Sequence, residues 1–386
     1  MSGIIVRPRS RILHGHDWVY STEVQKIFGS PEAGDVVALR DGRDRLLGSA
    51  IFNPHSKIVA RRFSHGRTAL DQELLHRRIQ RAWETRLKRG CDPLVCRVVW
   101  SESDGLPGVI LDRYGRVGVL QTLTFAMDRW KNEIAQQAAS ILDLDAVIER
   151  NNAGIRTAEG LPESVGVLFG ESSGELRVDL DGVTFDVSLL AGHKTGLYLD
   201  QREAYRTVAS HAKDRRVLDA FSNQGGFALA CAKAGAKSVL AVESSEACVA
   251  KIRSNAEANG LSIETMTADV FDYLPRAGHG QTTYGLIILD PPSFSKGRSS
   301  VHDALRGYQE LHRHAARLLE PDGLLATFSC AHHVSRTDFL TSLRDGFQDS
   351  KKRAHVIASF SQPADHPVLL SMPETEYLKG FLVQAV

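Results

Sequence analysis

The segment that decides the fold is Val217–Phe227, which has the sequence VLDAFSNQGGF. An apolar run ends at Asp219, and the pair Gly225-Gly226 stands immediately before a predicted helix. Glycines between a strand and a helix let a ligand approach the backbone at the carboxyl edge of a parallel sheet. The segment is not Gly-x-Gly-x-x-Gly, and Asp219 would repel a pyrophosphate but suits a positively charged ligand. An ordinary tight turn is the alternative interpretation.

Strands and helices alternate around this loop. Apolar runs predict strands at 216–219, 238–242, 286–289 and 324–328, and helical periodicity predicts helices at 227–234, 245–258 and 302–319. Apolar strands separated by amphipathic helices are typical of a parallel sheet covered on both faces. We therefore expect an α/β, Rossmann-like sheet in the last part of the chain, with ligands bound at the carboxyl ends of its strands.

Acidic residues follow further strands of this sheet. Glu243 and Ser244 end the second strand, about 20 residues after the glycine loop, where a carboxylate can accept both hydroxyls of a ribose. Asp269 follows a third strand and is expected to accept from an adenine amino group, with a solvated turn aspartate as the alternative. Asp290 begins the turn Asp290-Pro291-Pro292, whose fixed φ angles make a rigid lip.

The order of these groups resembles the class I S-adenosylmethionine-dependent methyltransferases. The positive sulfonium of that cofactor would explain why acidic rather than phosphate-binding groups line the site. The resemblance implies S-adenosyl-L-methionine as the cofactor. The residues expected to bind it from this sheet are Asp219, Phe221, Gly225, Glu243, Ser244, Asp269 and Asp290.

Cys330 directly follows another core strand, in the sequence TFSCAHH at 327–333. Carbon 5 of a pyrimidine is a poor nucleophile, but a thiolate that adds to carbon 6 makes carbon 5 enamine-like, so that it can attack a methyl donor. A cysteine at a strand end facing the base can do this, and we expect Cys330 to be the nucleophile. An inert buried thiol is the alternative, and it is our interpretation of Cys91, Cys96, Cys231 and Cys248.

The turn after Asp290 leaves a second chemistry open. Amino-methyltransferases have an aromatic residue directly after the two prolines, whereas here Ser293 precedes Phe294. That departure weakens methylation of an exocyclic amine without excluding it. The adjacent histidines His332 and His333 do not form a convergent ligand set, and we expect no metal site.

The first part of the chain has a different character. Short β-prone runs at 34–39, 46–52 and 58–63 predict a small all-β barrel, followed by a helix at 71–88 and a mixed α/β segment at 97–187. Residues 1–100 hold 18 Lys and Arg against 10 Asp and Glu, a net charge of +8, while the remainder holds 29 against 36, a net charge of −7. This layout favours a nucleic-acid docking module, with an ordinary solvated surface as the alternative.

Spaced motifs over nearly the whole chain resemble the bacterial 23S rRNA cytosine-5 methyltransferases that carry an N-terminal PUA domain. The motifs are HDWVYS (16–21), NPHS (53–56), ESDGLPG (102–108), DRYG (112–115), GHKTGLYLDQR (192–202), DHPV (365–368) and ETEYLKG (374–380). The resemblance implies a PUA-like β-barrel at 1–70, a small α/β middle domain at 71–187 and a class I methyltransferase domain at 188–386. Two departures are Ala331, where the family commonly has serine, and the loop segment Ser222-Asn223-Gln224.

The resemblance also implies residue roles. Thr195, Gly196 and Gln201 are expected to help close over the cofactor, although a structural hairpin is the alternative for this segment. Cys330 is expected to be the nucleophile, and Asp290 is expected to contact the base edge at N3. The implied activity is methylation of C5 of a cytosine in large-subunit rRNA, through a covalent Cys330 adduct at C6.

Two rival functions stay open. One is a related enzyme that methylates guanine N7 or an exocyclic amine of RNA, and the other is a non-catalytic RNA-binding assembly factor. The 386 residues are 42% hydrophobic and hold five cysteines, an odd number that suggests thiols in a reducing compartment. With no membrane-spanning run or signal peptide evident, we expect a cytoplasmic protein that binds large-subunit rRNA and no membrane, and a homodimer is retained as an expectation.

Overall fold

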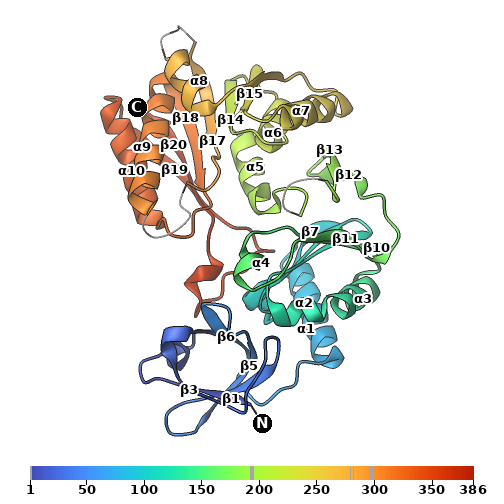
Figure 1. The fold of residues 1–386 in the computed structure, drawn as a ribbon. Coiled ribbons are helices and arrows are strands. Elements are labelled where there is room, and N and C mark those ends of the chain that lie inside the picture. The colour runs from blue at the N-terminus through green and yellow to red at the C-terminus, as the bar shows by residue number, and fades with distance from the viewer. Residues whose placement is uncertain (1, 192–194, 279, 281, 295–299) are drawn as a thin grey trace. The chain divides into compact units, whose positions relative to one another are not determined.

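The computed structural model describes residues 2–191, 195–278, 280, 282–294 and 300–386 (Figure 1). The chain divides into two compact units. The first comprises Met1–Val178, Val187–Leu199 and Ala364–Thr375, and the second comprises Asp179–Asp186, Asp200–Pro363 and Glu376–Val386. Within the described ranges, no helix is both long enough and apolar enough to cross a membrane. The division into three modules stays a prediction.

The N-terminal part of the first unit is all-β, as predicted. Its described strands form one sheet in the order β2-β6-β5-β4-β1-β3, in which only β1 and β4 pair in parallel. The apolar side chains of alternate strand residues, such as Ile4, Leu39 and Phe52, are buried together. The strands are β1 Gly3–Val6, β2 Trp18–Tyr20, β3 Val24–Phe28, β4 Val36–Arg40, β5 Leu46–Phe52 and β6 Ile58–Ser64.

A second sheet of the first unit follows the helix α1 (Gln72–Lys88), which the Asp71 side chain caps by accepting from the Leu74 amide at 2.9 Å. The sheet has the order β11-β10-β9-β8-β7. Between β9 and β10 the chain turns at Trp130, which separates the two helices α2 and α3. The further elements are β7 Val95–Trp100, β8 Val109–Tyr114, β9 Val117–Thr122, α2 Phe125–Arg129, α3 Lys131–Leu142, β10 Ala146–Asn151, α4 Ile155–Ala158 and β11 Ser164–Gly170.

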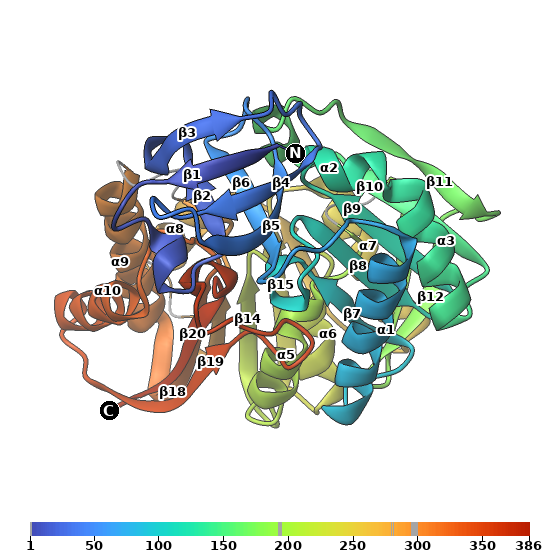
Figure 2. The ribbon, with the colours of Figure 1, turned by 90° about the horizontal axis from the view of Figure 1, so that it is seen from below.

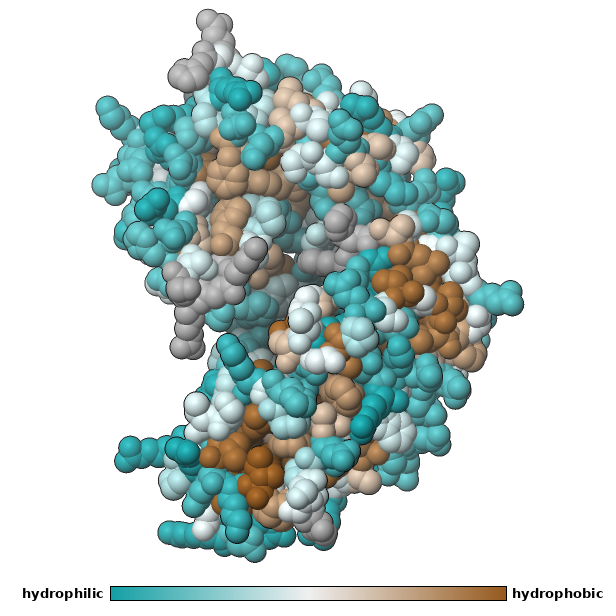
Figure 3. Space-filling model, in the orientation of Figure 1, coloured by the Kyte–Doolittle hydropathy of each residue, from teal (hydrophilic) through white to brown (hydrophobic). Residues whose placement is uncertain are grey.

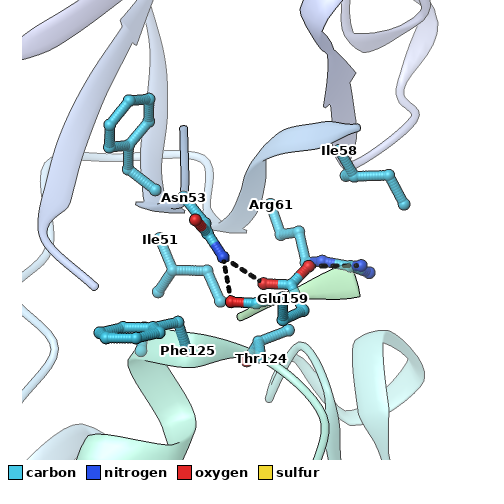
Figure 4. A pocket seen from close by; sticks show the side chains of 9 residues that line it. Ile51, Asn53, Ile58, Arg61, Thr124, Phe125 and Glu159 are labelled. Carbon is cyan, nitrogen blue, oxygen red and sulfur yellow. Dashed lines mark hydrogen bonds and ion pairs between the residues drawn. The ribbon is translucent and has the colours of Figure 1, made fainter. Parts of the chain in front are cut away.

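A pocket inside the first unit is lined by Asn53 of the NPHS motif together with Arg61 and Glu159 (Figure 4). Asn53 donates to the Glu159 carboxylate at 2.8 Å, and Arg61 lies 3.5 Å from the other Glu159 oxygen. Arg61 also pairs with Glu102 at 2.9 Å, and the Trp18 indole donates to the same carboxylate at 2.7 Å. Because buried charges need partners, these contacts join the N-terminal sheet to the next one.

The second unit is built on a sheet in which seven of the described strands have the order β16-β15-β14-β17-β18-β20-β19. The strands from β16 to β18 run parallel, as predicted, while β20 runs antiparallel to both of its neighbours. The strands are β14 Arg216–Ala220, β15 Ser238–Glu243, β16 Glu264–Thr267, β17 Tyr284–Leu289, β18 Leu319–Ser329, β19 Ala354–Ser361 and β20 Lys379–Ala385.

Helices cover both faces of this sheet, as Figures 1 and 2 show. Leu218 and Ile287 pack with α8, α9 and α10, whereas their strand neighbours Val217 and Ile288 pack with α5, α6 and α7. This alternation follows from the two-residue period of a strand. The helices are α5 Arg202–Ala209, α6 Gly226–Lys233, α7 Glu246–Ala258, α8 Val270–Ala277, α9 Val301–Leu318 and α10 Arg336–Asp349.

A hairpin of β12 (Glu175–Leu180) and β13 (Val183–Ser188) contributes its turn to the second unit. The Thr184 amide donates to the Asn259 side chain at 2.8 Å, and the Asp186 amide donates to Asn255 at 3.0 Å. Asn255 in the last turn of α7 and Asn259 at its C-cap, one helical turn apart, thus hold β13. Residues 179–186, which fall in the predicted middle domain, therefore pack with the catalytic sheet.

The surface seen in Figure 3 is largely hydrophilic, with local apolar patches. The edge strand β11 has exposed apolar side chains at alternate positions, with Val165, Val167 and Phe169 being 43%, 41% and 37% exposed. An apolar sheet edge is the kind of surface that a partner can cover. The homodimer stays a prediction.

Candidate functional site

Asp219 lies at the carboxyl end of β14 and is 1% exposed. Its Oδ2 accepts from the Ser222 hydroxyl at 2.6 Å and from the Ala228 amide, in the first turn of α6, at 3.0 Å. Burial raises the pKa of Asp219 to about 7, although these two hydrogen bonds lower it. The carboxylate therefore sits where only a cationic or hydrogen-donating ligand would favour its charged form.

The loop between β14 and α6 is tightly curled. Phe221 and Asn223 adopt φ values of +65° and +50°, and Gly225 has a φ of +85°. The amides of Phe221 and Ser222 both donate to the Val242 carbonyl of the neighbouring strand. Left-handed conformations at residues other than glycine are uncommon, and they gather where a loop is shaped for a ligand. The Gly225-Gly226 pair lies at the junction between β14 and α6, as predicted, and its backbone lies at the edge of the sheet.

The second glycine of the pair has a packing role. A Cβ atom at Gly226 would lie 2.4 Å from the ring of Tyr205 on α5, whereas Gly225 is needed for its positive φ. The Tyr205 ring also packs edge-on against Phe227 at 4.6 Å between centroids. The glycine pair therefore serves both the loop conformation and the close approach of α5 to α6.

Glu243, at the end of β15, ties the two loops of the sheet edge together. Its Oε2 accepts from the Asn223 amide at 3.0 Å, and its Oε1 accepts from the Ser245 amide at 3.0 Å and the Ser244 hydroxyl at 3.1 Å. Since a carboxylate has about four acceptor positions, these bonds leave capacity for a further donor. The structure thus places Glu243 and Ser244 beside the Asp219 loop.

Asp269 has a local role in addition to the predicted one. It is exposed at the N-terminus of α8, where its Oδ1 accepts from the Phe271 amide at 2.8 Å. The amide of Ala268 donates to the Glu243 carbonyl, so Asp269 lies near the end of β15. The N-cap satisfies an otherwise orphaned helix donor. The contact with an adenine amino group stays a prediction.

Asp290 directly follows β17 and is joined to Gln201, the residue before α5. The Gln201 side-chain amide donates to Asp290 Oδ2 at 3.0 Å, and Gln201 is 2% exposed. Because β14 and β17 are parallel neighbours, Asp290 and Asp219 share one edge of the sheet. The structure therefore brings together Gln201 and Asp290, which were predicted separately as site residues.

Three oxygen atoms at this edge are buried without a hydrogen-bond partner in the described ranges: Asp219 Oδ1, Asn223 Oδ1 and Gln201 Oε1. All three are acceptors, and an unsatisfied buried acceptor is costly. S-adenosylmethionine carries an ammonium group, ribose hydroxyls and an adenine amino group as donors. The residues present therefore fit this cofactor. Asn223 was not predicted individually, although it lies within the deciding loop.

Aromatic rings continue along the same edge. Phe221 packs against Phe271 at 6.0 Å between centroids, Phe271 against Phe294 at 5.5 Å, and Phe294 against Tyr308 of α9 at 4.7 Å. Phe294 is half-buried in this row. The Phe294 ring is thus part of the wall formed by α8 and α9. This packing is the structural consequence of Ser293, which places Phe294 one residue further from the two prolines than in amino-methyltransferases.

Cys330 lies immediately after β18, the next strand beyond β17 in the sheet, and is half-buried. The hydroxyl of Tyr308 donates to Ser329 Oγ at 2.9 Å, and the charges of Cys330 and Asp290 both act on that tyrosine. Burial, which is the largest effect, and both of these charges raise the Tyr308 pKa, so it stays a neutral donor. Cys330 and Asp290 thus follow adjacent parallel strands, and both affect Tyr308; their roles as nucleophile and base contact stay predictions.

Two of the predicted cofactor residues lie in the first unit. Thr195 donates to Asp112 at 2.5 Å, and Asp112 also pairs with Arg97 at 2.7 Å. Gly196 has a φ of +135°, and the backbone amide of the next residue, Leu197, donates to the Tyr114 hydroxyl at 3.0 Å. These contacts give Thr195 and Gly196 structural roles. Their part in cofactor binding stays a prediction, and residues 192–194 of the same motif lie outside the described residues.

Across the described ranges, no group of three or more His, Cys, Asp or Glu side chains is arranged to hold a metal ion. His312 is buried on α9 and contacts the Thr327 hydroxyl at 2.9 Å, and burial lowers its pKa to about 4. It is a neutral core histidine at pH 7.

Comparison with known proteins adds family matches to this geometry. Residues 161–369 match the family model described as S-adenosylmethionine-dependent methyltransferase, and residues 7–65 match a PUA-like domain. The chain is 33% identical to the Ribosomal RNA large subunit methyltransferase I of Vibrio cholerae, covering 98% of this chain and 97% of the relative. It is 34% identical to the protein of the same name from Pseudoalteromonas translucida, covering 95% and 94%.

Solved structures share the fold over the whole chain. A protein of Streptococcus mutans described as a SAM-dependent methyltransferase matches with a TM-score of 0.86 and 24% identity, covering 100% of both chains. A methyltransferase structure complexed with S-adenosylhomocysteine matches with a TM-score of 0.87 and 23% identity, again covering 100% of both. At this level of identity the likeness establishes the fold, including the Rossmann-like sheet predicted above.

Proposed function

Because the chain belongs to the S-adenosylmethionine-dependent methyltransferases, in the family of the Ribosomal RNA large subunit methyltransferases I, we propose that it methylates C5 of a cytosine in large-subunit rRNA. The observation that carries the choice of atom is the position of Cys330 at the end of β18, beside Asp290 at the end of β17. A thiol next to the cofactor edge supplies the nucleophile that C5 chemistry requires.

The cysteine acts on the base rather than on the methyl group. The Cys330 thiolate adds to C6 of cytosine, a C–S bond forms, and the electron pair of the C5–C6 double bond becomes available at C5. Bound S-adenosylmethionine supplies the electrophilic methyl group that C5 then takes. Removal of the C5 proton restores the double bond and expels the Cys330 thiolate, so that the enzyme returns to its starting state.

Asp290 would act at the opposite edge of the ring. Its carboxyl group, oriented by Gln201 at 3.0 Å, can share a proton with N3. A proton held at N3 draws electron density from C6 and favours addition of the thiolate. The half-buried Phe294, already packed between Phe271 and Tyr308, is less suited to stack on an amine substrate. This packing favours C5 over an exocyclic amine as the acceptor.

The N-terminal part of the first unit is the proposed RNA-docking surface. Its match to a PUA-like domain and its exposed cations, among them Arg7, Arg9 and Lys57, support contacts with the phosphate backbone. The cytosine must leave any stacked helix, or be unpaired already, to meet both Cys330 and the cofactor. In this proposal the protein works in the cytoplasm on ribosomal RNA.

RNA that contains 5-fluorocytidine tests the covalent step. Once C5 carries both fluorine and a methyl group, it holds no proton to remove, and fluorine does not leave as a cation, so the C6–S bond persists. We expect a complex that survives denaturing electrophoresis, requires S-adenosylmethionine and maps by mass spectrometry to the peptide containing Cys330. Methylation of ordinary rRNA without any trapped complex on the fluorinated rRNA would rule out the Cys330 adduct.

A further inference from the structure

Lys379 lies next to the nucleophile through the pairing of β18 with β20. In that antiparallel ladder Ser329 is opposite Lys379, and Phe328 is opposite Gly380. A Cβ atom at Gly380 would lie 2.4 Å from the Phe328 ring, so glycine is needed for the strands to pair at this point. The register thereby places Lys379 beside the residue that precedes Cys330. Lys379 lies within the ETEYLKG motif, but no role was assigned to it from the sequence.

The Lys379 side chain is buried and directed at the cysteine loop. Lys379 is 6% exposed, and its Nζ donates to the carbonyl oxygen of Ala331 at 2.6 Å. Ala331 directly follows Cys330, so this bond fixes the backbone on the far side of the nucleophile. A lysine is rarely buried to this degree unless it has a compensating partner.

Cys330 is one of the groups that affect the pKa of Lys379. Burial lowers the pKa of Lys379 to about 8, and the charge of Cys330 opposes that effect more strongly than that of Glu376, while Arg336 adds to it. Glu376 lies 3.9 Å from Arg336, so its negative charge acts on Arg336 as well as on Lys379. At pH 7 the ammonium form of Lys379 still prevails, and a thiolate at Cys330 would favour that form further.

Three further groups in the region of Cys330 are Tyr308, Asp290 and His332. Tyr308 is held neutral by burial, and Asp290 carries a charge of the same sign as a thiolate. His332, two residues further on, packs its ring against Tyr377 at 5.7 Å. A cation close to a cysteine favours its thiolate form, and Lys379, bonded to the residue after Cys330, is such a cation.

We propose that Lys379 is a positioning residue for Cys330: its ammonium stabilises the thiolate, and its bond to Ala331 holds the loop that presents the sulfur to the base. The inference rests on the proposed function, in which Cys330 attacks C6. Lys379 keeps its own protons throughout, and the thiol proton passes to solvent water. When the adduct breaks down, the same ammonium stabilises the thiolate that leaves.

The test measures the thiol directly. Alkylation of Cys330 by iodoacetamide, in which the thiolate displaces iodide, is followed against pH by mass spectrometry of the Cys330 peptide. In Lys379→Met we expect the alkylation midpoint to rise by about one pH unit or more, which is about a tenfold lower rate at pH 7. Lys379→Arg, which keeps the charge, should restore most of the rate.

Lys352→Met is the matched control. Lys352 also donates from Nζ to a carbonyl of β18, that of Leu319 at 2.8 Å, and burial also lowers its pKa, but it lies at the other end of the strand. We expect this variant to leave the Cys330 midpoint unchanged. Lys379→Gln, which can still donate to Ala331, covers the case in which Lys379→Met fails to fold. An unchanged midpoint in a folded Lys379→Met or Lys379→Gln protein would overturn the inference.

This result is separable from that of the proposed function. Alkylation needs neither RNA nor cofactor, so it reports on the thiol whatever the substrate is. A shifted midpoint in Lys379→Gln together with full methyl transfer by Cys330→Ala would refute the covalent mechanism while leaving the electrostatic role of Lys379 in place. Normal trapping on fluorinated RNA together with an unchanged alkylation midpoint in Lys379→Gln would support the covalent mechanism and refute the electrostatic role of Lys379.

Discussion

Replacement of Cys330 by alanine is expected to lower the rate of methyl transfer to rRNA by about 1,000-fold or more, because the nucleophile that activates C5 is lost. The change removes one sulfur atom at a half-buried position, so the fold should be retained. Binding of S-adenosylmethionine should be unchanged, because the cofactor contacts assigned here come from other residues. Single-turnover transfer of labelled methyl and calorimetric binding of the cofactor measure the two effects separately.

Cys248→Ala provides the control for this variant. Cys248 is 7% exposed on α7 of the same unit, and its amide is held by the Ser245 cap rather than by any group of the candidate site. We expect its methyl-transfer rate to stay within about twofold of the native rate, as is usual for substitutions away from reacting groups. An unchanged rate in Cys330→Ala would remove the covalent mechanism and favour an acceptor such as guanine N7 or an exocyclic amine.

Asp219→Asn is expected to weaken binding of S-adenosylmethionine by about 10- to 100-fold, the range for losing one charge-assisted hydrogen bond. The variant is nearly isosteric, and its Oδ1 can still accept from Ser222 and Ala228. Its amide group then occupies the position of the partnerless Asp219 Oδ1 and presents a donor to the donors of the ligand. Binding is measured by calorimetry at pH 6, 7 and 8.

The pH dependence of both proteins follows from the raised pKa of Asp219, about 7 against an ordinary value of 3.8. In this prediction the charged form of Asp219 binds the cofactor, so native affinity should fall as the pH drops below 7, and Asp219→Asn should lack this component. A carboxyl group with a raised pKa favours the folded state at low pH, and that stability is lost as pH rises towards 7. At pH 8 the ligand-free Asp219→Asn protein should therefore be more stable than the native protein, because asparagine places no charge in this buried position.

Asp214→Asn is the control for the second variant. Asp214 is exposed just before the other end of β14, and its φ of +59° is one that asparagine adopts readily. We expect neither its affinity for the cofactor nor its pH profile to change. Native-like binding by Asp219→Asn at all three pH values would mean that Asp219 only shapes the loop.

The catalytic sheet was predictable because its signals are local. Each apolar run of β14, β15, β17 and β18 is long enough to identify a buried strand, and parallel strands bring their carboxyl ends to one edge. This is why Asp219, Glu243 and Asp290 could be placed together before their contacts were known. The antiparallel return of β20 was not predicted, since strand direction at the end of a sheet depends on long-range pairing.

The charge of the N-terminal region shows where sequence reasoning stops. Arg61, Arg86 and Arg97 contribute to the excess of positive charge in residues 1–100, yet each pairs with an acid that follows residue 100. Their partners are Glu102, Asp104 and Asp112. Part of the positive charge expected to bind nucleic acid is therefore neutralised by ion pairs inside the first unit. A count of charges along the chain does not reveal this pairing.

Lys379 and Asn223 were missed for a related reason. Lys379 is 49 residues after Cys330 in sequence and reaches it only through the register of β18 and β20. Asn223 matters through its positive φ and its partnerless oxygen, which are properties of the folded loop. Thr195 shows the converse, because a residue assigned to cofactor binding from a motif has a buried structural partner in Asp112.

The most direct test of C5 methylation follows the hydrogen that the methyl group replaces. Large-subunit rRNA that lacks this modification is prepared with tritium at C5 of its cytosines and incubated with the protein and S-adenosylmethionine. We predict that one tritium is released to water for each methyl group transferred, and that the product nucleoside is 5-methylcytidine. Methyl transfer with tritium retained, with 4-methylcytidine or 7-methylguanosine as the product, would contradict the account.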